Sequence, residues 1–226
     1  METIMKIIIN NYTKYIKKRT ILKDINLELE SGKIYGFRGQ NGCGKTMLMR
    51  AVAGLIYPDK GYVEIDGKKL GKDISLPPSI GILIENPSFL NEYTGYSNLK
   101  MLSDISCHLG KKQLYHVLEL VGLSPKDKRL FREYSLGMRQ KLGIAAAIMG
   151  EPDIIILDEP INAIDEDGIK KIRQILYDLR DKGKLIIIAC HDKEELDYLS
   201  DEIYVIDNGR IIDRVNAAVS GESEFI

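Results

Sequence analysis

The stretch from Gly39 to Thr46 has the residue types and spacing of a phosphate-binding loop. It reads G-x-x-x-x-G-K-T, and its members are Gly39, Gln40, Asn41, Gly42, Cys43, Gly44, Lys45 and Thr46. Glycines let such a loop turn tightly, so that its backbone N–H groups can approach an anion. The lysine can reach the terminal phosphates of a nucleotide, and the threonine hydroxyl can ligate Mg²⁺. The pattern therefore predicts nucleotide binding; the alternative is an ordinary strand-to-helix turn.

Two acidic residues, Asp158 and Glu159, follow the apolar run Ile154–Leu157. A carboxylate at the end of a buried strand can hold Mg²⁺ against bound phosphates, and we expect this of Asp158. Glu159 can point in a different direction, which suits it to activate an attacking water as a general base. The alternative is that the two acids only cap or stabilise a turn.

A histidine, His191, ends the next apolar run of the chain, in Ala189-Cys-His-Asp192. If the two runs are parallel strands, their ends lie at the same edge of the sheet. We then expect His191 to contact the γ-phosphate and to fix the water near Glu159. A lone histidine is more often structural, and that is the alternative here.

Strands and helices alternate along the chain, and these elements must position the polar residues. Apolar and polar residues alternate within residues 4–30, which predicts antiparallel strands there, separated by a polar loop at 11–19. Apolar runs predict further strands at 33–37, 61–67, 79–85, 152–157 and 184–190, and Asn208-Gly209 predicts the turn of a hairpin at 202–212. Helical periodicity predicts helices at 47–54 and 168–181 and a helical stretch at 94–150. Such alternation predicts an α/β sheet that binds ligands at the carboxyl ends of its strands.

Composition restricts the class of protein. The chain has 226 residues, which suits one domain, and its 32 Lys+Arg against 33 Asp+Glu imply no nucleic-acid partner. The three cysteines show no C-x-x-C spacing, which argues against a zinc site and fits a reducing cytosol. No apolar run approaches the roughly 20 residues that a bilayer requires, and the first residues lack a signal-peptide pattern. A role at the membrane would therefore need a separate partner chain.

The order of these motifs resembles the nucleotide-binding subunits of ABC (ATP-binding cassette) transporters over essentially the whole chain. Gly39–Thr46 is similar to the Walker A motif of that family. Ile154–Glu159 is similar to the Walker B motif with its catalytic glutamate, and His191 to the switch histidine. The resemblance implies hydrolysis of MgATP, with Lys45 and the loop amides on the phosphates.

Two further positions take a role only from the resemblance. Asp165, in Asn162-Ala-Ile-Asp165, resembles the aspartate of the D-loop. Tyr15, upstream of the phosphate loop, resembles the aromatic residue that stacks on adenine, and Tyr12 is the second choice for that role. Either tyrosine could instead pack against a strand edge.

The signature motif departs from the pattern of the family. Tyr134-Ser-Leu-Gly-Met138 stands in the place of Leu-Ser-Gly-Gly-Gln, so that Ser135 and Gly137 are retained and the glutamine is lost at Met138. Ser135 can cap a helix running to Ile148, and its hydroxyl, the Gly137 N–H and the helix dipole can then face a γ-phosphate. The resemblance implies that this phosphate belongs to the opposite subunit of a dimer. The alternative is a serine-capped helix without a ligand.

A second departure is Glu85, which ends the strand Ile80–Ile84 where the family has a glutamine. A carboxylate can ligate Mg²⁺ more strongly than an amide, but it adds negative charge near Glu159 and the phosphates. We hypothesise that Glu85 is a working substitute and a metal ligand. A glutamate at this place also resembles exporters of the peptide-antibiotic self-protection type.

The resemblance implies a P-loop α/β fold with an N-terminal antiparallel portion. Residues 1–88 and 151–226 would form the core of one domain, and residues 89–150 an inserted helical subdomain. It implies an ATPase that dimerises with a second such subunit and powers a membrane-spanning permease, in the direction of export, from the cytoplasmic face of the membrane. The alternatives are a non-transport ABC ATPase and a regulatory ATP-binding module.

Overall fold

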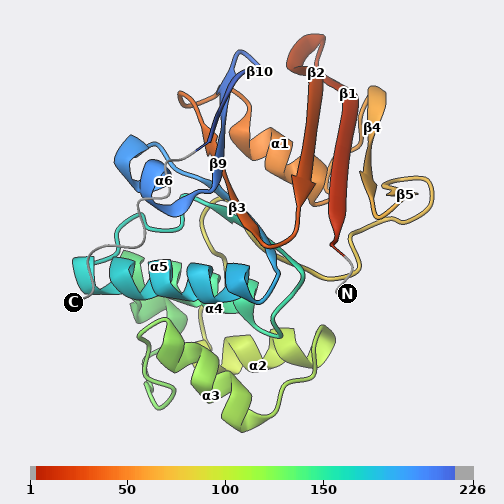
Figure 1. The fold of residues 1–226 in the computed structure, drawn as a ribbon. Helices are drawn as coiled ribbons and strands as arrows, with labels where there is room; N and C mark the ends of the chain where they lie inside the picture. The colour runs from red at the N-terminus through yellow and green to blue at the C-terminus, as the bar shows by residue number, and fades with distance from the viewer. Residues whose placement is uncertain (1–3, 217–226) are drawn as a thin grey trace.

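The computed structural model describes residues 4–216, and its centre is a six-stranded sheet in the order β10-β9-β3-β8-β7-β6. Strands β9, β3, β8, β7 and β6 run parallel, and β10 pairs antiparallel with β9 at one edge. The strands are β3 (Lys33–Arg38), β6 (Ile80–Leu83), β7 (Ile154–Asp158), β8 (Leu185–Ala189), β9 (Glu202–Asp207) and β10 (Arg210–Asn216). Figure 1 shows this sheet between two layers of other elements.

Both faces of the central sheet are buried, which explains why β7 and β8 are continuously apolar. On one face, Ile155 and Leu157 of β7 pack in a core with helices α4 (Leu136–Ile148), α5 (Glu166–Asp181) and α6 (Lys193–Leu199). On the other face, Ile154 and Ile156 pack in a second core with α1 (Lys45–Val52) and the antiparallel sheet. Successive side chains of a strand point to opposite faces of the sheet, so each strand contributes to both cores.

The second sheet is antiparallel, in the order β2-β1-β4-β5. Its strands are β1 (Lys6–Ile16), β2 (Arg19–Glu30), β4 (Lys60–Ile65) and β5 (Lys68–Lys69). The predicted loop at 11–19 is wrong, because β1 continues to Ile16 and only Lys17 and Lys18 form the turn, with φ of 46° and 67°. Register shifts between Ile9 and Tyr15 break the simple alternation, which is why this part of the strand looked like a loop.

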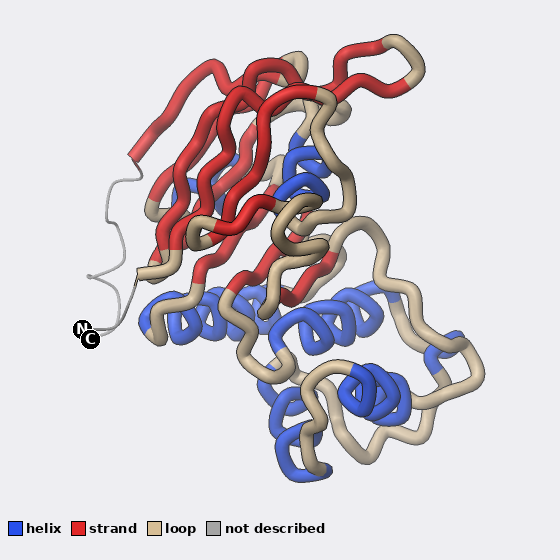
Figure 2. The backbone as a smooth tube through the Cα atoms, turned by 90° about the vertical axis from the view of Figure 1, so that its right-hand side faces the viewer, coloured by secondary structure: helices blue, strands red, loops and turns tan. Residues whose placement is uncertain are grey.

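Helices fill the stretch between β6 and β7, as the periodicity predicted. They are α2 (Gly95–Ile105), α3 (Lys111–Leu120), the short 3₁₀ helix Phe131–Glu133, and α4. Figure 2 shows α2 and α3 on the side of the molecule away from the antiparallel sheet. The division into a core and a subdomain at residues 89 and 150 stays a prediction. Within residues 4–216 the structure has no helix that is long and apolar enough to cross a membrane.

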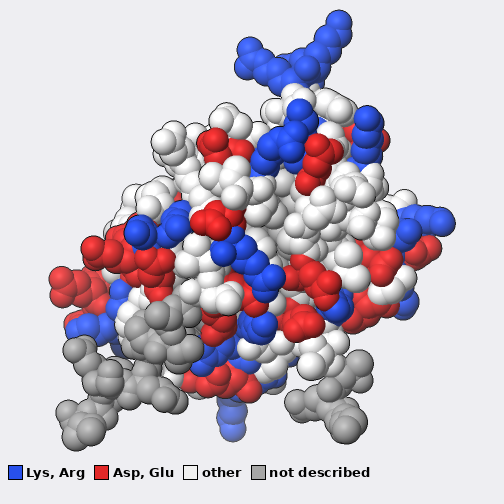
Figure 3. Space-filling model, turned by 45° about the horizontal axis from the view of Figure 1, so that its top comes forward, with Lys and Arg blue, Asp and Glu red and all other residues white. Residues whose placement is uncertain are grey.

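Charged side chains of both signs are interspersed on the face drawn in Figure 3. Such a face lacks the single-sign field that attracts a polyanion.

Candidate functional site

The phosphate loop joins the carboxyl end of β3 to the start of α1. The helix begins at Lys45, so Lys45 and Thr46 lie in its first turn, two residues earlier than the sequence predicted. Gly44 precedes it with φ of 118°, a conformation that favours glycine, and no side chain caps the helix. The first-turn N–H groups are therefore left for an anion, which the helix dipole also favours.

Lys45 lies inside the loop rather than on the surface. Its side chain is buried, and Nζ donates hydrogen bonds to the carbonyl oxygens of Gly39 at 2.7 Å and Gln40 at 3.3 Å. The Cys43 N–H also donates to the Gln40 carbonyl, at 3.2 Å. These contacts hold the ammonium group at the centre of the loop, where it can meet phosphate oxygens.

A cavity of about 220 Å³ opens beside the loop and brings half of the predicted site residues together. It is lined by Ile21, Asn41, Gly42, Gly44, Lys45, Thr46, Met47, Asp158, Glu159 and His191. The Thr46 hydroxyl donates to Asp158 Oδ2 at 2.6 Å. Two protein oxygens beside a phosphate cradle fit Mg²⁺, which usually takes one or two protein ligands and fills its remaining positions with phosphates and water.

Glu159 and His191 meet at the carboxyl ends of β7 and β8. His191 Nδ1 lies 2.7 Å from Glu159 Oε1, and the Glu159 N–H donates to the Ala189 carbonyl at 2.8 Å. Glu159 Oε2 is buried and has no hydrogen-bond partner among the described residues. One carboxylate oxygen is thus oriented by the histidine, and the other is left for a water or a substrate proton.

The pKa of Glu159 lies above its usual value. Burial of the carboxylate is the main cause, and the nearby charge of Asp158 adds to it. The charges of His191 and Lys45 act in the opposite direction and favour the ionised form. A raised pKa in a cavity is typical of a group that exchanges protons during a reaction.

The signature helix α4 begins at Leu136 and is capped by Ser135, as the sequence predicted. The Ser135 hydroxyl accepts a hydrogen bond from the Met138 N–H at 3.2 Å, and the serine itself is exposed. A Cβ at Gly137 would stand 2.5 Å from the Ala163 carbonyl oxygen, so this close approach requires glycine. Neither Ser135 nor Gly137 is among the residues lining the cavity at the phosphate loop.

Asp165 and Tyr15 also lie outside the lining of that cavity. Asp165 precedes α5 and forms an ion pair with Lys141 at 2.7 Å, and the hydrogen bond from this lysine lowers the pKa of the carboxyl group. Tyr15 is 41% exposed and pairs with Thr20 across the hairpin, next to the cavity residue Ile21. The second choice, Tyr12, is wrong, because its ring is completely buried and its hydroxyl donates to the Ile56 carbonyl at 3.2 Å.

Glu85 pairs with an arginine of the helix that follows the phosphate loop. Its carboxylate accepts a hydrogen bond from Arg50 of α1 at 2.6 Å, and its φ is 65°. It is not among the residues that line the cavity containing Thr46 and Asp158. The structure therefore shows a partner that the sequence did not indicate, and a role for Glu85 as a metal ligand stays a prediction.

Two residues near the site carry contacts that sequence reasoning missed. Arg50 binds Glu85, and Gln140 of α4 donates hydrogen bonds to the backbone of Glu159 and Pro160. Gln140 lies shortly after the signature motif, but nothing in the sequence says which carbonyl it meets. Both contacts join segments that are far apart in the chain.

The fold and this cavity define a P-loop nucleotide-hydrolysing domain. A protein-family model described as "ABC transporter" matches residues 22–162. The chain is 44% identical over 201 residues to an uncharacterised ABC transporter ATP-binding protein of Bacillus subtilis, YybJ, across 89% of this chain and 92% of that protein. It is 41% identical over 208 residues to the bacitracin transport ATP-binding protein BcrA of Enterococcus faecalis, across 91% of this chain and 68% of that protein. The chain therefore belongs to the ABC transporter family, as an ATP-binding subunit with ATPase activity.

A solved structure agrees with this assignment at the level of the fold. It is a dimeric ATP-binding cassette in a post-hydrolysis state bound to ADP and Pi, with a TM-score of 0.84 and 23% sequence identity. The match covers 94% of this chain and 99% of that chain. The expected P-loop α/β architecture is thereby confirmed.

Replacing the buried lysine tests the phosphate loop. We expect Lys45→Ala to weaken ATP binding by about 10- to 100-fold, because a charge-assisted hydrogen bond contributes roughly 1.5–3 kcal/mol. Titration of ATP by calorimetry measures the affinity, and circular dichroism checks the fold. Lys68→Ala, at an exposed lysine of β5, is the control and should bind as the wild type does. Unaltered affinity in Lys45→Ala would remove the role given to the loop.

Replacing Glu85 tests whether it works in the place of the family's glutamine. We expect Glu85→Ala to lower ATPase and transport rates by about tenfold, roughly 1.4 kcal/mol of activation free energy. Glu92→Ala is a matched control, since Glu92 is another exposed acid paired with an arginine, Arg132, at 2.7 Å. Wild-type rates of both hydrolysis and transport in Glu85→Ala would show that Glu85 is dispensable.

Proposed function

We propose that this ATPase subunit dimerises on ATP and powers a separate membrane-spanning permease, in the direction of export, at the cytoplasmic face of the membrane. The observation that carries the transport role is the 41% identity to a bacitracin transport ATP-binding protein. Glu85 at the end of the strand is a second pointer toward a peptide-antibiotic exporter. The permease would supply the recognition of the transported compound.

The proposed roles at the site follow from its geometry. Lys45 and the free N–H groups of α1 would bind the phosphates of ATP, while Thr46 and Asp158 would hold Mg²⁺. Bound Mg²⁺ would supply charge stabilisation at the phosphates. Glu159 would take a proton from the attacking water at its free oxygen, and His191 would keep the carboxylate oriented. Tyr15 would stack on the adenine.

The second half of the site would come from another subunit. Ser135 and Gly137 lie at the exposed start of α4 and outside the cavity of their own phosphate loop. A head-to-tail dimer would bring this helix start to the γ-phosphate on the partner, and Asp165 would lie at the same interface. The solved neighbour of 0.84 TM-score is itself dimeric, which supports this arrangement.

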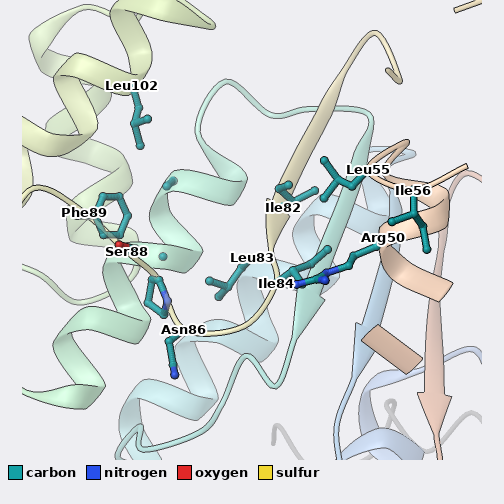
Figure 4. Close-up of a pocket in the computed structure, with 13 residues that line it drawn as sticks. Arg50, Leu55, Ile56, Ile82, Leu83, Ile84, Asn86, Ser88, Phe89 and Leu102 are labelled. Atoms are coloured by element: carbon teal, nitrogen blue, oxygen red, sulfur yellow. The ribbon is translucent and has the colours of Figure 1, made fainter. Parts of the chain in front are cut away.

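A second and larger cavity, of about 490 Å³, suits a docking segment of the permease. Figure 4 shows Phe89 and Leu102 on one side and Leu55 on the other, with Ile82 between them. Most of its lining is apolar, and Ile84 and Asn86, the two neighbours of Glu85, belong to it. A segment bound there would touch the residues on either side of Glu85.

Placing a charge in this groove tests the proposed docking. We expect Leu102→Glu to lose co-purification with the proposed permease, because a carboxylate would be desolvated in the apolar groove. The ATPase activity of the isolated subunit should persist. Leu120→Glu in α3 is the matched control, since Leu102 and Leu120 are 39% and 38% exposed. Unchanged co-purification in Leu102→Glu would reject the groove, and the absence of any co-purifying permease would reject the transport role.

A further inference from the structure

The Gln140 side chain joins the signature helix to the end of β7. It is 7% exposed, and its Nε2 donates to the carbonyl oxygens of Glu159 at 2.8 Å and of Pro160 at 3.2 Å. A buried amide that meets two successive carbonyls fixes both the position and the direction of that backbone segment. The segment carries the side chain of Glu159.

The backbone around Glu159 has an unfavourable conformation, which contacts with neighbouring elements must stabilise. Glu159 has φ of 51° and Ala163 has φ of 61°, in the left-handed region that residues with a Cβ seldom occupy. The Glu159 N–H is held by the Ala189 carbonyl of β8 at 2.8 Å. Gln140 holds the carbonyl side of the same residue. Glu159 is thus fixed between a strand and a helix.

Two neighbours of Gln140 on α4 contact the same loop farther along. Gly137 lies against the Ala163 carbonyl, and Lys141 pairs with Asp165 at 2.7 Å. Positions 137, 140 and 141 have the spacing i, i+3 and i+4 and so lie on one face of the helix. This face follows the loop from residue 159 to residue 165. A shift of α4 would therefore move the loop with it.

We propose that Gln140 is a positioning residue for Glu159, which transmits the position of the signature helix to the general base of its own chain. The inference rests on the roles proposed above for Glu159 and Ser135. When the start of α4 binds the nucleotide of the partner, this contact would then fix the position of Glu159 in the subunit that α4 belongs to. The two sites of a dimer would be coupled through a hydrogen bond within each chain.

Gln140→Met tests the contact, because methionine has a similar length and shape but no donor. We expect kcat for ATP to fall by about 10- to 100-fold, since a misplacement of about 1 Å can cost that much. The Kd for ATP should stay unchanged, because Lys45 and Thr46 keep their contacts. Gln113→Met is the control: Gln113 accepts from the Gly110 N–H at 2.9 Å at the start of α3, far from the site in sequence.

The double variant with Glu159→Gln separates positioning from a general loss of structure. If Gln140 acts through Glu159, Gln140→Met should lower the single-turnover rate of Glu159→Gln no further. A merely structural role would overturn the inference, and two results would show it. Gln140→Met would lower the single-turnover rate of Glu159→Gln by the same factor as it lowers that of the wild type, or Gln140→Met alone would weaken ATP binding and lower Tm together with kcat. If Gln140→Met has a normal kcat while Glu159→Gln is slow, the positioning role of Gln140 is overturned and Glu159 keeps its role as the base. Normal turnover in Glu159→Gln would remove the base role itself.

Discussion

Glu159→Gln should bind ATP normally and hydrolyse it about 10²- to 10⁴-fold more slowly, the range that a general base contributes. The amide keeps the size of the carboxylate and can still contact His191, which lies 2.7 Å from Glu159 Oε1 in the wild type. It cannot take a proton from water. The unpartnered oxygen, Oε2, is the atom whose basicity is lost. The fold should tolerate the change, because the amide removes a charge that burial disfavours.

Slow hydrolysis should also change the assembly of the variant. ATP would remain between two subunits, so that the ATP-bound dimer accumulates, and light scattering after gel filtration with ATP measures it. Glu166→Gln, at an exposed acid in the first turn of α5, is the control and should hydrolyse ATP as the wild type does. Normal turnover of Glu159→Gln would refute the assignment of the base.

The pH dependence gives a second readout of the same residue. The pKa of Glu159 is raised, mainly by burial, so that the carboxyl group holds its proton to a higher pH than a free glutamate. A protonated carboxyl cannot act as a base, and the wild-type rate should therefore fall as pH decreases through this raised pKa. That acidic limb should be absent from the residual rate of Glu159→Gln. A limb that is identical in both proteins would assign it to another group.

Much of this site could be predicted because its residues are local in sequence. The glycine loop, Asp158 and His191 each follow an apolar run directly, and parallel strands of a buried sheet bring such positions to one edge. The cap of α4 was equally local, since Ser135 and the Met138 N–H are three residues apart. Contacts between residues that are close in sequence can be predicted from the sequence itself.

The remaining features depend on contacts between distant segments. The bulges in β1 hid a strand that extends to Ile16, because they place Tyr12 and Thr13 in the interior one after the other. The pairing of Glu85 with Arg50 spans 35 residues, and that of Gln140 with Glu159 spans 19. No periodicity or propensity encodes which of several polar groups such a side chain will meet.

These distant contacts change how the two halves of the site are understood. The family resemblance implies that Ser135 completes the site of the opposite subunit, whereas Glu159 acts in the site of its own chain. Gln140 and Lys141 connect the helix that Ser135 caps to the loop that starts at Glu159. Within each chain, side-chain contacts therefore join the helix that would bind the partner's nucleotide to the loop that carries the general base of its own site.

Ser135→Arg should stop most hydrolysis without removing ATP binding to the monomer. The side chain of Ser135 is exposed, so an arginine has room in the single chain, and loss of the cap costs only about 0.5–2 kcal/mol. In a head-to-tail dimer the arginine would fill the space of the partner's γ-phosphate and remove donors aimed at it. Loss of such donors lowers rates by about 10²- to 10³-fold.

Two controls isolate the dimer effect. Thr94→Ala removes a comparable cap, since the Thr94 hydroxyl accepts from the Ser97 N–H at 3.2 Å at the start of α2. Ser124→Arg adds an arginine at another exposed serine of the helical part. Both should keep most of the ATPase activity. Undiminished activity in Ser135→Arg itself would remove the argument for the signature helix.

Mixing Ser135→Arg with Lys45→Ala gives the sharpest test of the arrangement. In a head-to-tail dimer of one chain of each kind, one site combines the intact phosphate loop of the first chain with the intact α4 start of the second. The other site carries both defects. The mixture should therefore regain ATPase activity that neither variant shows alone, as measured by phosphate release after the two proteins are combined. If each chain completed its own site, every site would keep one defect, and mixing would restore nothing.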